Sequence, residues 1–253
     1  TLTEQGNEYF FRAVGTSELF AKAFAKALKE QLKINRIAYL AVNDDWGRGS
    51  TKAFSEAFAS LGGVNLTTEI FGMNDTDYYT YLSKIKSLNP DGLYIVGNTA
   101  NAAMITNQLR ELGLTCAVFG EGAWTSDNYL NLTGTNSNGV YGVIEYLYTV
   151  DTEMNRKFVK HYQETYSGAT PDKYSASLYQ VIYIIAQAID RAGSTDPAKV
   201  QQALKKTNYV GLSGPMMFSP TKNQAYGFNM YMARIENGKP VLALSAPLEN
   251  PEK

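Results

Sequence analysis

Strand-like runs alternate with amphipathic segments between about residues 36 and 120 of this chain. The first run, residues 37–42, is continuously apolar, as in a strand buried on both faces. Strands are predicted at residues 37–42, 64–71, 93–96 and 117–119. Helices with apolar residues every three or four positions are predicted at about residues 50–61, 78–88 and 102–112. Each helix ends at a glycine or at Asn89-Pro90, so the alternation predicts a parallel sheet covered by helices on both faces.

The pattern changes after about Thr149. Two consecutive helices are predicted at residues 152–166 and 174–192. A third is predicted from Asp196-Pro197 to Lys206, because Asp196 is a suitable N-cap and Pro197 a suitable first helical residue. Strands are then predicted at residues 216–218, 227–235 and 241–244. The first two flank a polar turn, and Asn237-Gly238 before the third is a strong hairpin signal. An α/β half followed by helices and a hairpin predicts two lobes.

Charge and hydropathy exclude two classes of protein. The chain has 23 basic and 24 acidic residues and a net charge of −1, so it lacks the basic surface that nucleic-acid binding needs. No segment reaches the roughly 18 consecutive apolar residues of a transmembrane helix. The first residues, Thr1 to Glu4, lack the features of a signal peptide, and we expect that such a signal was cleaved or left out.

The residues needed for common catalytic and metal sites are missing. The single histidine, His161, lies in a predicted helix, and the single cysteine, Cys116, lies in an apolar run that favours a buried thiol. A zinc site of the Cys/His type is therefore excluded. A serine or cysteine triad would have to use His161, and no G-x-S-x-G nucleophile elbow precedes it. The segment Gly47–Lys52 has the wrong order for a phosphate loop, and no dinucleotide fingerprint follows any strand. We expect no enzyme activity, no cofactor and no metal.

Polar and aromatic residues follow three of the predicted parallel strands. Ligands bind beyond the carboxyl ends of strands in open parallel sheets, so these loops should converge at one edge. They are residues 43–50, 97–101 and 120–126. They contribute Trp46 and Trp124, the carboxylate of Glu121, and amide and hydroxyl groups at Asn98 and Thr99.

This set of residues suits a small zwitterion. A buried ammonium group needs an acidic partner and acceptors, which Glu121, Asn98 or Thr99 would supply. Trp46 and Trp124 would form an apolar wall. A structural interpretation fits the same residues: the tryptophans would pack against their own loops, and Glu121 would be a solvated turn residue.

Several stretches occur in a recognisable order along the chain. They are Leu2-Thr3-Glu4 with Tyr9-Phe10-Phe11-Arg12, the strand and loop from Arg36 to Gly49, Asn89 to Tyr94, Gly120-Glu121-Gly122, Gly139 to Gly142, and Tyr174 to Tyr179. Together they resemble the periplasmic leucine/isoleucine/valine-binding proteins. The resemblance covers nearly the whole chain. It implies an α/β protein of the type I periplasmic-binding fold, with two Rossmann-like lobes of parallel sheet flanked by helices and the first lobe incomplete.

The resemblance also implies lobe boundaries and site residues. Residues 1–14 would be a first-lobe remnant and hinge, 15–147 the second lobe, 148–227 helices and a hairpin of the first lobe, and 228–253 a return to the second lobe. Trp46 takes the place of an aromatic residue that covers the ligand, and Asn98 and Thr99 the place of a second contact. Glu121 lies within one position of the acidic residue that binds the α-ammonium group, and an ungapped match puts Gly122 there.

Family members begin with strand–helix units that this chain lacks, so its helices 152–166 and 174–192 would expose an apolar stripe. We therefore expect a missing N-terminal lobe segment, or another chain, as a partner. The implied function is the solute-binding component of an ABC transporter, which captures a small amino acid by hinge motion and delivers it to a membrane permease. The protein would be periplasmic or extracellular, either free or lipid-anchored. The alternatives are a ligand-sensing regulator with the same fold and a nucleotide-dependent α/β enzyme.

Overall fold

The structure is a computed structural model that describes residues 2–121 and 124–252, which form two compact units. The first unit comprises Thr1–Leu19, Glu145–Met230 and Ala246–Lys253. The second unit comprises Phe20–Ile144 and Tyr231–Ser245. The lobe boundaries implied by the resemblance stay a prediction.

The second unit is built on a seven-stranded sheet in the order β10-β9-β5-β4-β3-β1-β2. Its strands are β1 (Arg36–Val42), β2 (Val64–Phe71), β3 (Gly92–Val96), β4 (Ala117–Glu121), β5 (Tyr141–Ile144), β9 (Asn229–Glu236) and β10 (Lys239–Pro247). The pairs from β2 through β1, β3 and β4 to β5 are parallel, whereas β5 pairs with β9 antiparallel. The predicted parallel sheet is therefore confirmed, with its four predicted strands.

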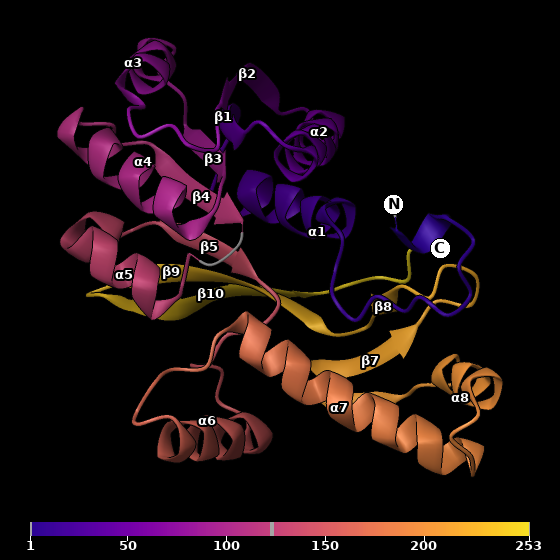
Figure 1. Cartoon of the computed structure of the whole chain (residues 1–253). Coiled ribbons are helices and arrows are strands. Elements are labelled where there is room, and N and C mark those ends of the chain that lie inside the picture. Colours follow the sequence, from indigo (N-terminus) through magenta and orange to yellow (C-terminus); the bar gives the residue numbers. More distant parts are fainter. Residues whose placement is uncertain (1, 122–123, 253) are drawn as a thin grey trace. The chain divides into compact units, whose positions relative to one another are not determined.

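Helices cover both faces of this sheet (Figure 1). On one face lie α1 (Ser17–Glu30) and α2 (Asp45–Ser60), and on the other lie α3 (Tyr79–Ser87), α4 (Thr99–Glu111) and α5 (Asp127–Thr133), which leads into a 3-10 turn at Gly134–Ser137. The three predicted helices are confirmed. Helices α2 and α4 begin earlier than expected because Asp44 and Asn98 cap their first turns.

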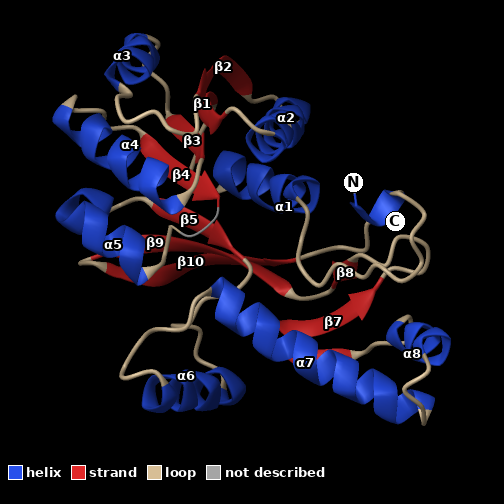
Figure 2. Cartoon of the chain, in the orientation of Figure 1, coloured by secondary structure: helices blue, strands red, loops and turns tan. Residues whose placement is uncertain are grey.

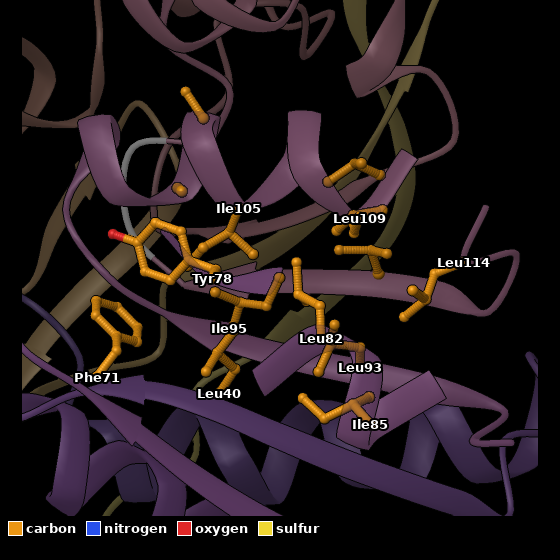
Figure 3. Packing of buried hydrophobic residues seen from close by; sticks show 14 of the residues in the cluster. Leu40, Phe71, Tyr78, Leu82, Ile85, Leu93, Ile95, Ile105, Leu109 and Leu114 are labelled. Atoms are coloured by element: carbon orange, nitrogen blue, oxygen red, sulfur yellow. The ribbon is translucent and has the colours of Figure 1, made fainter. Parts of the chain in front are cut away.

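The core between the sheet and helices α3 to α5 is built mainly of aliphatic and aromatic side chains (Figure 3). Leu40 of β1 and Ile95 of β3 face Ile105 and Leu109 of α4, and Leu82 of α3 joins them. All five side chains are fully buried, so this face supplies much of the hydrophobic stabilisation of the unit.

Helix α1 was not predicted. Its residues Phe20, Phe24 and Leu28 are buried and recur at helical spacing, and the side chain of Lys29 donates to the carbonyl of Gly62 after α2 (2.9 Å). The apolar period of an amphipathic helix was thus present in the sequence before the first predicted strand.

In its described residues, the first unit contains helices α6, α7 and α8 and a small antiparallel sheet, and Figure 2 shows its helices and strands by colour. The elements are a 3-10 turn at Leu2–Glu4, α6 (Glu153–Thr165), α7 (Lys173–Ala192), α8 (Pro197–Leu204), β6 (Tyr209–Gly211), β7 (Gly214–Phe218) and β8 (Ala225–Tyr226). The predicted helices are confirmed, including the N-cap at Asp196 and Pro197 in the first turn of α8. The extended segment around Arg12 pairs with Gln224, next to β8. No helix in the described ranges is long and apolar enough to cross a membrane.

One predicted strand relationship is wrong. Residues 216–218 and 227–235 were expected on two sides of one polar turn, but β7 pairs with β6 and with β8, a short strand missed in the sequence. Strand β9 instead joins the large sheet beside β5. The hairpin signal at Asn237-Gly238 is confirmed, since both residues adopt positive φ angles between the neighbouring strands β9 and β10.

Candidate functional site

Three strands of the second unit end level with one another at one edge of the sheet. Ala41 of β1 pairs with Val96 of β3, and Val96 pairs with Glu121 of β4. The loops that follow these strands therefore emerge side by side, as predicted for the carboxyl edge of a parallel sheet. The first two lead directly into the N-termini of α2 and α4.

Trp46 lies in the first turn of α2, and 38% of its surface is exposed. The turn is fixed because Asp44 caps the helix by accepting from the backbone N–H of Gly47 (2.7 Å). Gly47 is required here, since a Cβ atom would overlap the carbonyl oxygen of Val42. Arg48 also ties the turn by donating to Asn43 (2.6 Å). An exposed indole is thus held on a rigid turn at the sheet edge.

Asn98 and Thr99 form the start of α4. The side-chain oxygen of Asn98 accepts from the backbone N–H of Asn101 (3.0 Å), so this residue acts as the N-cap. Its side-chain amide group still offers donors at an exposed position. Thr99, the first helical residue, is half-buried. Helix N-termini favour negative charge, so this end of α4 suits a carboxylate.

Glu121 ends β4 and is only 5% exposed. The hydroxyl group of Tyr94 donates to its carboxylate (3.0 Å) from the neighbouring strand β3. The ring of Tyr94 stacks on Phe54 of α2, with 4.4 Å between ring centroids. Burial, and then the negative charge of Glu121, raise the pKa of Tyr94 well above its usual value, so Tyr94 stays a donor. The interpretation of Glu121 as a solvated turn residue is therefore wrong.

Trp124 lies in the core, with 1% of its surface exposed. Its ring contacts Tyr129 of α5 (5.3 Å between centroids) and covers Gly120, where a Cβ atom would overlap the indole. Its indole N–H has no hydrogen-bond partner among the described residues. The structure thus places this ring in the core between the sheet and helices α3 to α5. The remaining predicted site residue, Gly122, lies outside the described residues.

The structure adds Tyr94 and Phe54 to the predicted set. Sequence reasoning missed both because each lies in an apolar pattern, one in a strand and one on a helix, where an aromatic ring is usually a core residue. Neither a strand nor a helix pattern shows that the hydroxyl group of Tyr94 reaches the carboxylate of Glu121 on the neighbouring strand. Within residues 2–121 and 124–252, no group of histidine, cysteine and acidic residues is arranged to hold a metal ion.

Residues 1–240 match the periplasmic binding protein family. A Leu/Ile/Val-binding protein homologue of Brucella melitensis is 25% identical over 80% of this chain and 55% of its own length. A leucine-, isoleucine-, valine-, threonine- and alanine-binding protein of Pseudomonas aeruginosa is 21% identical over 86% of this chain and 58% of its own length. The chain thus spans little more than half the length of these relatives.

Solved structures give the same result for the fold. The leucine-binding protein LivK of Thermotoga maritima superposes with a TM-score of 0.87 at 25% identity, covering 98% of this chain and 70% of that one. LivJ of Streptococcus pneumoniae, solved with isoleucine, has a TM-score of 0.85 at 22% identity, over 97% and 69%. A solute-binding protein of R. palustris, solved with benzoate, has a TM-score of 0.84 at 20% identity, over 96% and 67%.

The parallel sheet, its flanking helices and these matches agree with one another. The chain belongs to the periplasmic binding protein family, whose members are solute-binding proteins.

Proposed function

We propose that the complete protein is the solute-binding component of an ABC transporter that captures a small amino acid, with branched-chain amino acids favoured. The observation that carries the proposal is the buried carboxylate of Glu121 at the same sheet edge as the N-terminus of α4. An α-amino acid has an ammonium group that would bind the Glu121 carboxylate and a carboxylate that would bind the N-terminus of α4. The relatives named for leucine, isoleucine and valine support this ligand class.

Glu121 also argues against an aromatic acid. A benzoate-binding protein shares the fold, but benzoate carries a negative charge and no ammonium group. A second negative charge near a buried carboxylate is unfavourable, whereas an ammonium group is attracted to it.

We further propose that Trp46 covers the bound ligand when a second lobe closes over it. Its exposed ring and fixed turn support this role. The ligand would shift the population toward the closed form because it binds the closed form more tightly than the open form. The closed form would then dock on a membrane permease. Such a protein would work in the periplasm or outside the cell, either free or lipid-anchored.

The test is calorimetric titration of the complete polypeptide that the gene encodes. The ligands are leucine, isoleucine, valine, threonine, alanine and benzoate. We expect saturable binding of aliphatic amino acids with a Kd on the order of micromolar, or about −8 kcal/mol, and no binding of benzoate. Saturation by benzoate alone, or silence with every amino acid, would overturn the proposal.

Replacement of Trp46 by alanine tests the covering residue. Burial of an aromatic ring contributes about 1.5–3 kcal/mol, so Trp46→Ala should weaken leucine binding at least about tenfold. Trp46→Phe, the matched control, keeps a ring and should retain most of the affinity. An unchanged Kd in Trp46→Ala would remove this residue from the site. Because Trp46 is 38% exposed and the rest of its ring packs on the protein, the unfolding temperature of both variants is measured beside the Kd, so that a loss of folding is separated from a loss of binding.

A further inference from the structure

Strand β10 lies at one edge of the seven-stranded sheet (Figure 1). In the described chain it pairs with β9 and with no other strand. It has 9 residues, and all of them except Pro240 are exposed or half-buried. Val241 is 44% exposed and Leu242 is 43% exposed, although consecutive strand residues point to opposite faces. The edge of β10 and both of its faces are therefore accessible.

The sequence of β10 contains none of the residues that usually protect such an edge. From Pro240 to Leu248 there is no charged side chain, and Ser245 is the one polar residue. Free edges are normally protected by charged side chains, prolines or bulges, because their backbone N–H and C=O groups readily pair with another strand. The stretch Val241–Ala246 has neither a charge nor a proline.

The opposite edge of the same sheet is protected. Strand β2 carries a charge at Glu69, which Lys84 of α3 pairs at 2.6 Å. Its register with β1 is also irregular between Ile37 and Ala38. A charged and irregular edge strand resists pairing with a further strand. The two edges thus differ, and β10 has the properties of a strand that another strand covers.

A second copy of β10 fits this edge in the antiparallel orientation. Lys239 begins the strand, Glu249 follows two residues after its end, and both are exposed. With a two-fold axis at Leu244, Lys239 of each copy lies opposite Glu249 of the other, and Leu242 lies opposite Ala246. A parallel pair in register would instead place Lys239 beside Lys239, and like charges directly opposite each other are destabilising. The charges at the two ends therefore favour antiparallel pairing.

We propose that the β10 edge, residues 239–249, pairs with the same edge of a second copy across a two-fold axis. The two seven-stranded sheets then form one continuous sheet. Because a two-fold contact uses the same surface on both copies, it leaves no β10 edge free and stops at a dimer. The proposal needs no ligand, so it stands or falls separately from the proposed function.

Sedimentation velocity of the complete polypeptide that the gene encodes tests the proposal. Over a concentration series from about 1 to 100 μM, we expect an equilibrium of monomer and dimer with a Kd on the order of micromolar. Lys239→Glu places like charges opposite each other at both ends of the contact, so it should weaken the dimer at least about tenfold.

A charge swap makes the test specific to this register. Adding Glu249→Lys to Lys239→Glu restores opposite charges and should return the Kd to within about threefold of the original value. Lys52→Glu, on the exposed side of α2, makes the same change in net charge and is the matched control. It should leave the Kd unchanged.

Leu242→Lys tests the middle of the edge. A lysine there introduces the charge that β10 lacks, so the variant should stay monomeric over the whole series. Its thermal unfolding is measured alongside. If this variant fails to fold, the charge swap still decides, because Lys239 and Glu249 are exposed.

Three results would overturn the proposal. The first is a monomer at every concentration of the unchanged polypeptide, because the edge would then be free or covered within one polypeptide. The second is a dimer that persists in both Lys239→Glu and a folded Leu242→Lys, which would assign the contact to another surface. The third is a charge-swapped variant that dimerises no better than Lys239→Glu alone.

Discussion

Tyr94 shows how one hydroxyl group connects the core of the second unit to its candidate site. It lies in a buried strand, between the ring of Phe54 and the carboxylate of Glu121. A buried carboxylate is unfavourable unless it is hydrogen-bonded, so this bond lets Glu121 remain at the sheet edge with little exposure. The stability of the unit and the chemistry of the site therefore depend on the same contact.

Removal of this hydroxyl group in Tyr94→Phe should lower the free energy of unfolding by about 1.5–3 kcal/mol, the range for hydrogen bonds to charged groups. Tyr39→Phe is the control, because the hydroxyl of Tyr39 donates to the neutral amide oxygen of Asn65 (2.6 Å) and should contribute only about 0.5–1.5 kcal/mol. Urea denaturation of both variants makes the comparison. Equal losses would show that the carboxylate gains nothing special from Tyr94.

At the scale of elements, α2 carries two glycines with opposite requirements. Gly47 faces the carbonyl of Val42, whereas a Cβ atom at Gly49 would meet open space. The first glycine permits close packing of helix on strand, and the second only weakens the helix.

Gly47→Ala should therefore lower the free energy of unfolding by about 1–3 kcal/mol, because the helix start must shift away from β1. Gly49→Ala, two residues along the same helix, should raise it by about 0.5–1 kcal/mol through helix propensity. Thermal unfolding of the two variants measures both signs. A stabilised Gly47→Ala variant would contradict the close approach of α2 to β1.

One ion pair links β2 to α3 and should depend on pH. Lys84 lies 2.6 Å from Glu69, which also accepts from Thr67. Burial alone would raise the pKa of Glu69, but the hydrogen bonds from Lys84 and Thr67 and the charge of Lys84 outweigh it, so the pKa is lowered. Because the pKa of Glu69 is lower in the folded state, its charge stabilises the fold at pH values above about 4.3, the pKa of glutamate in an unfolded chain. This stabilisation is lost as the pH falls through the pKa of Glu69 in the folded state.

Lys84→Met should thus lower the free energy of unfolding by about 0.5–1 kcal/mol at pH 7, a modest value because Lys84 is largely exposed, and by less at pH 3. The control is Lys52→Met, which breaks the fully exposed pair with Glu56 (4.0 Å) and should change little at either pH. Urea denaturation at the two pH values measures the difference. An equal loss from Lys84→Met at pH 3 and pH 7 would contradict the role of the Glu69 charge.

At the scale of the molecule, the two units differ in the extent of their buried apolar cores. The second unit has one continuous core that joins the sheet to α3, α4 and α5. The core around α6 is small, with only Tyr146, Phe158, Ala176 and Leu212 buried at its centre within the described chain. Because burial of apolar area is the main source of stability, the first unit should be the less stable one.

Hydrogen exchange of the 253-residue chain tests this difference. Amide protons of α6 should exchange at least about 100-fold faster than those of β1 and β3. Helix α4 of the second unit is the control for a helix that is exposed on one side, and its buried positions should exchange as slowly as β3. Equal protection of α6 and β3 would show that the two units unfold together.

Strands β1 to β4 and helices α2 to α4 of the second unit could be predicted because local signals agree there with the tertiary structure, whereas α5 and β5 were not predicted. The apolar run of β1, the glycine stops and the Asn89-Pro90 end of α3 each act within a few residues. Helix α1 had the same kind of period and was overlooked, whereas β8 has two residues and no pattern to detect. The pairing of β9 with β5 joins residues about 90 positions apart, which no local signal encodes.

By itself, the sequence determined the fold class, the edge of the sheet where the candidate site lies, and the residues in its loops, because strand and helix periods and turn residues are local properties. Only the tertiary structure decided what those side chains do: Trp46 is exposed, Trp124 is in the core, and Glu121 is buried against Tyr94. Tryptophan and glutamate suit either environment, and which one they meet depends on packing between distant segments. That packing also leaves Leu178 and Ile182 of α7 exposed.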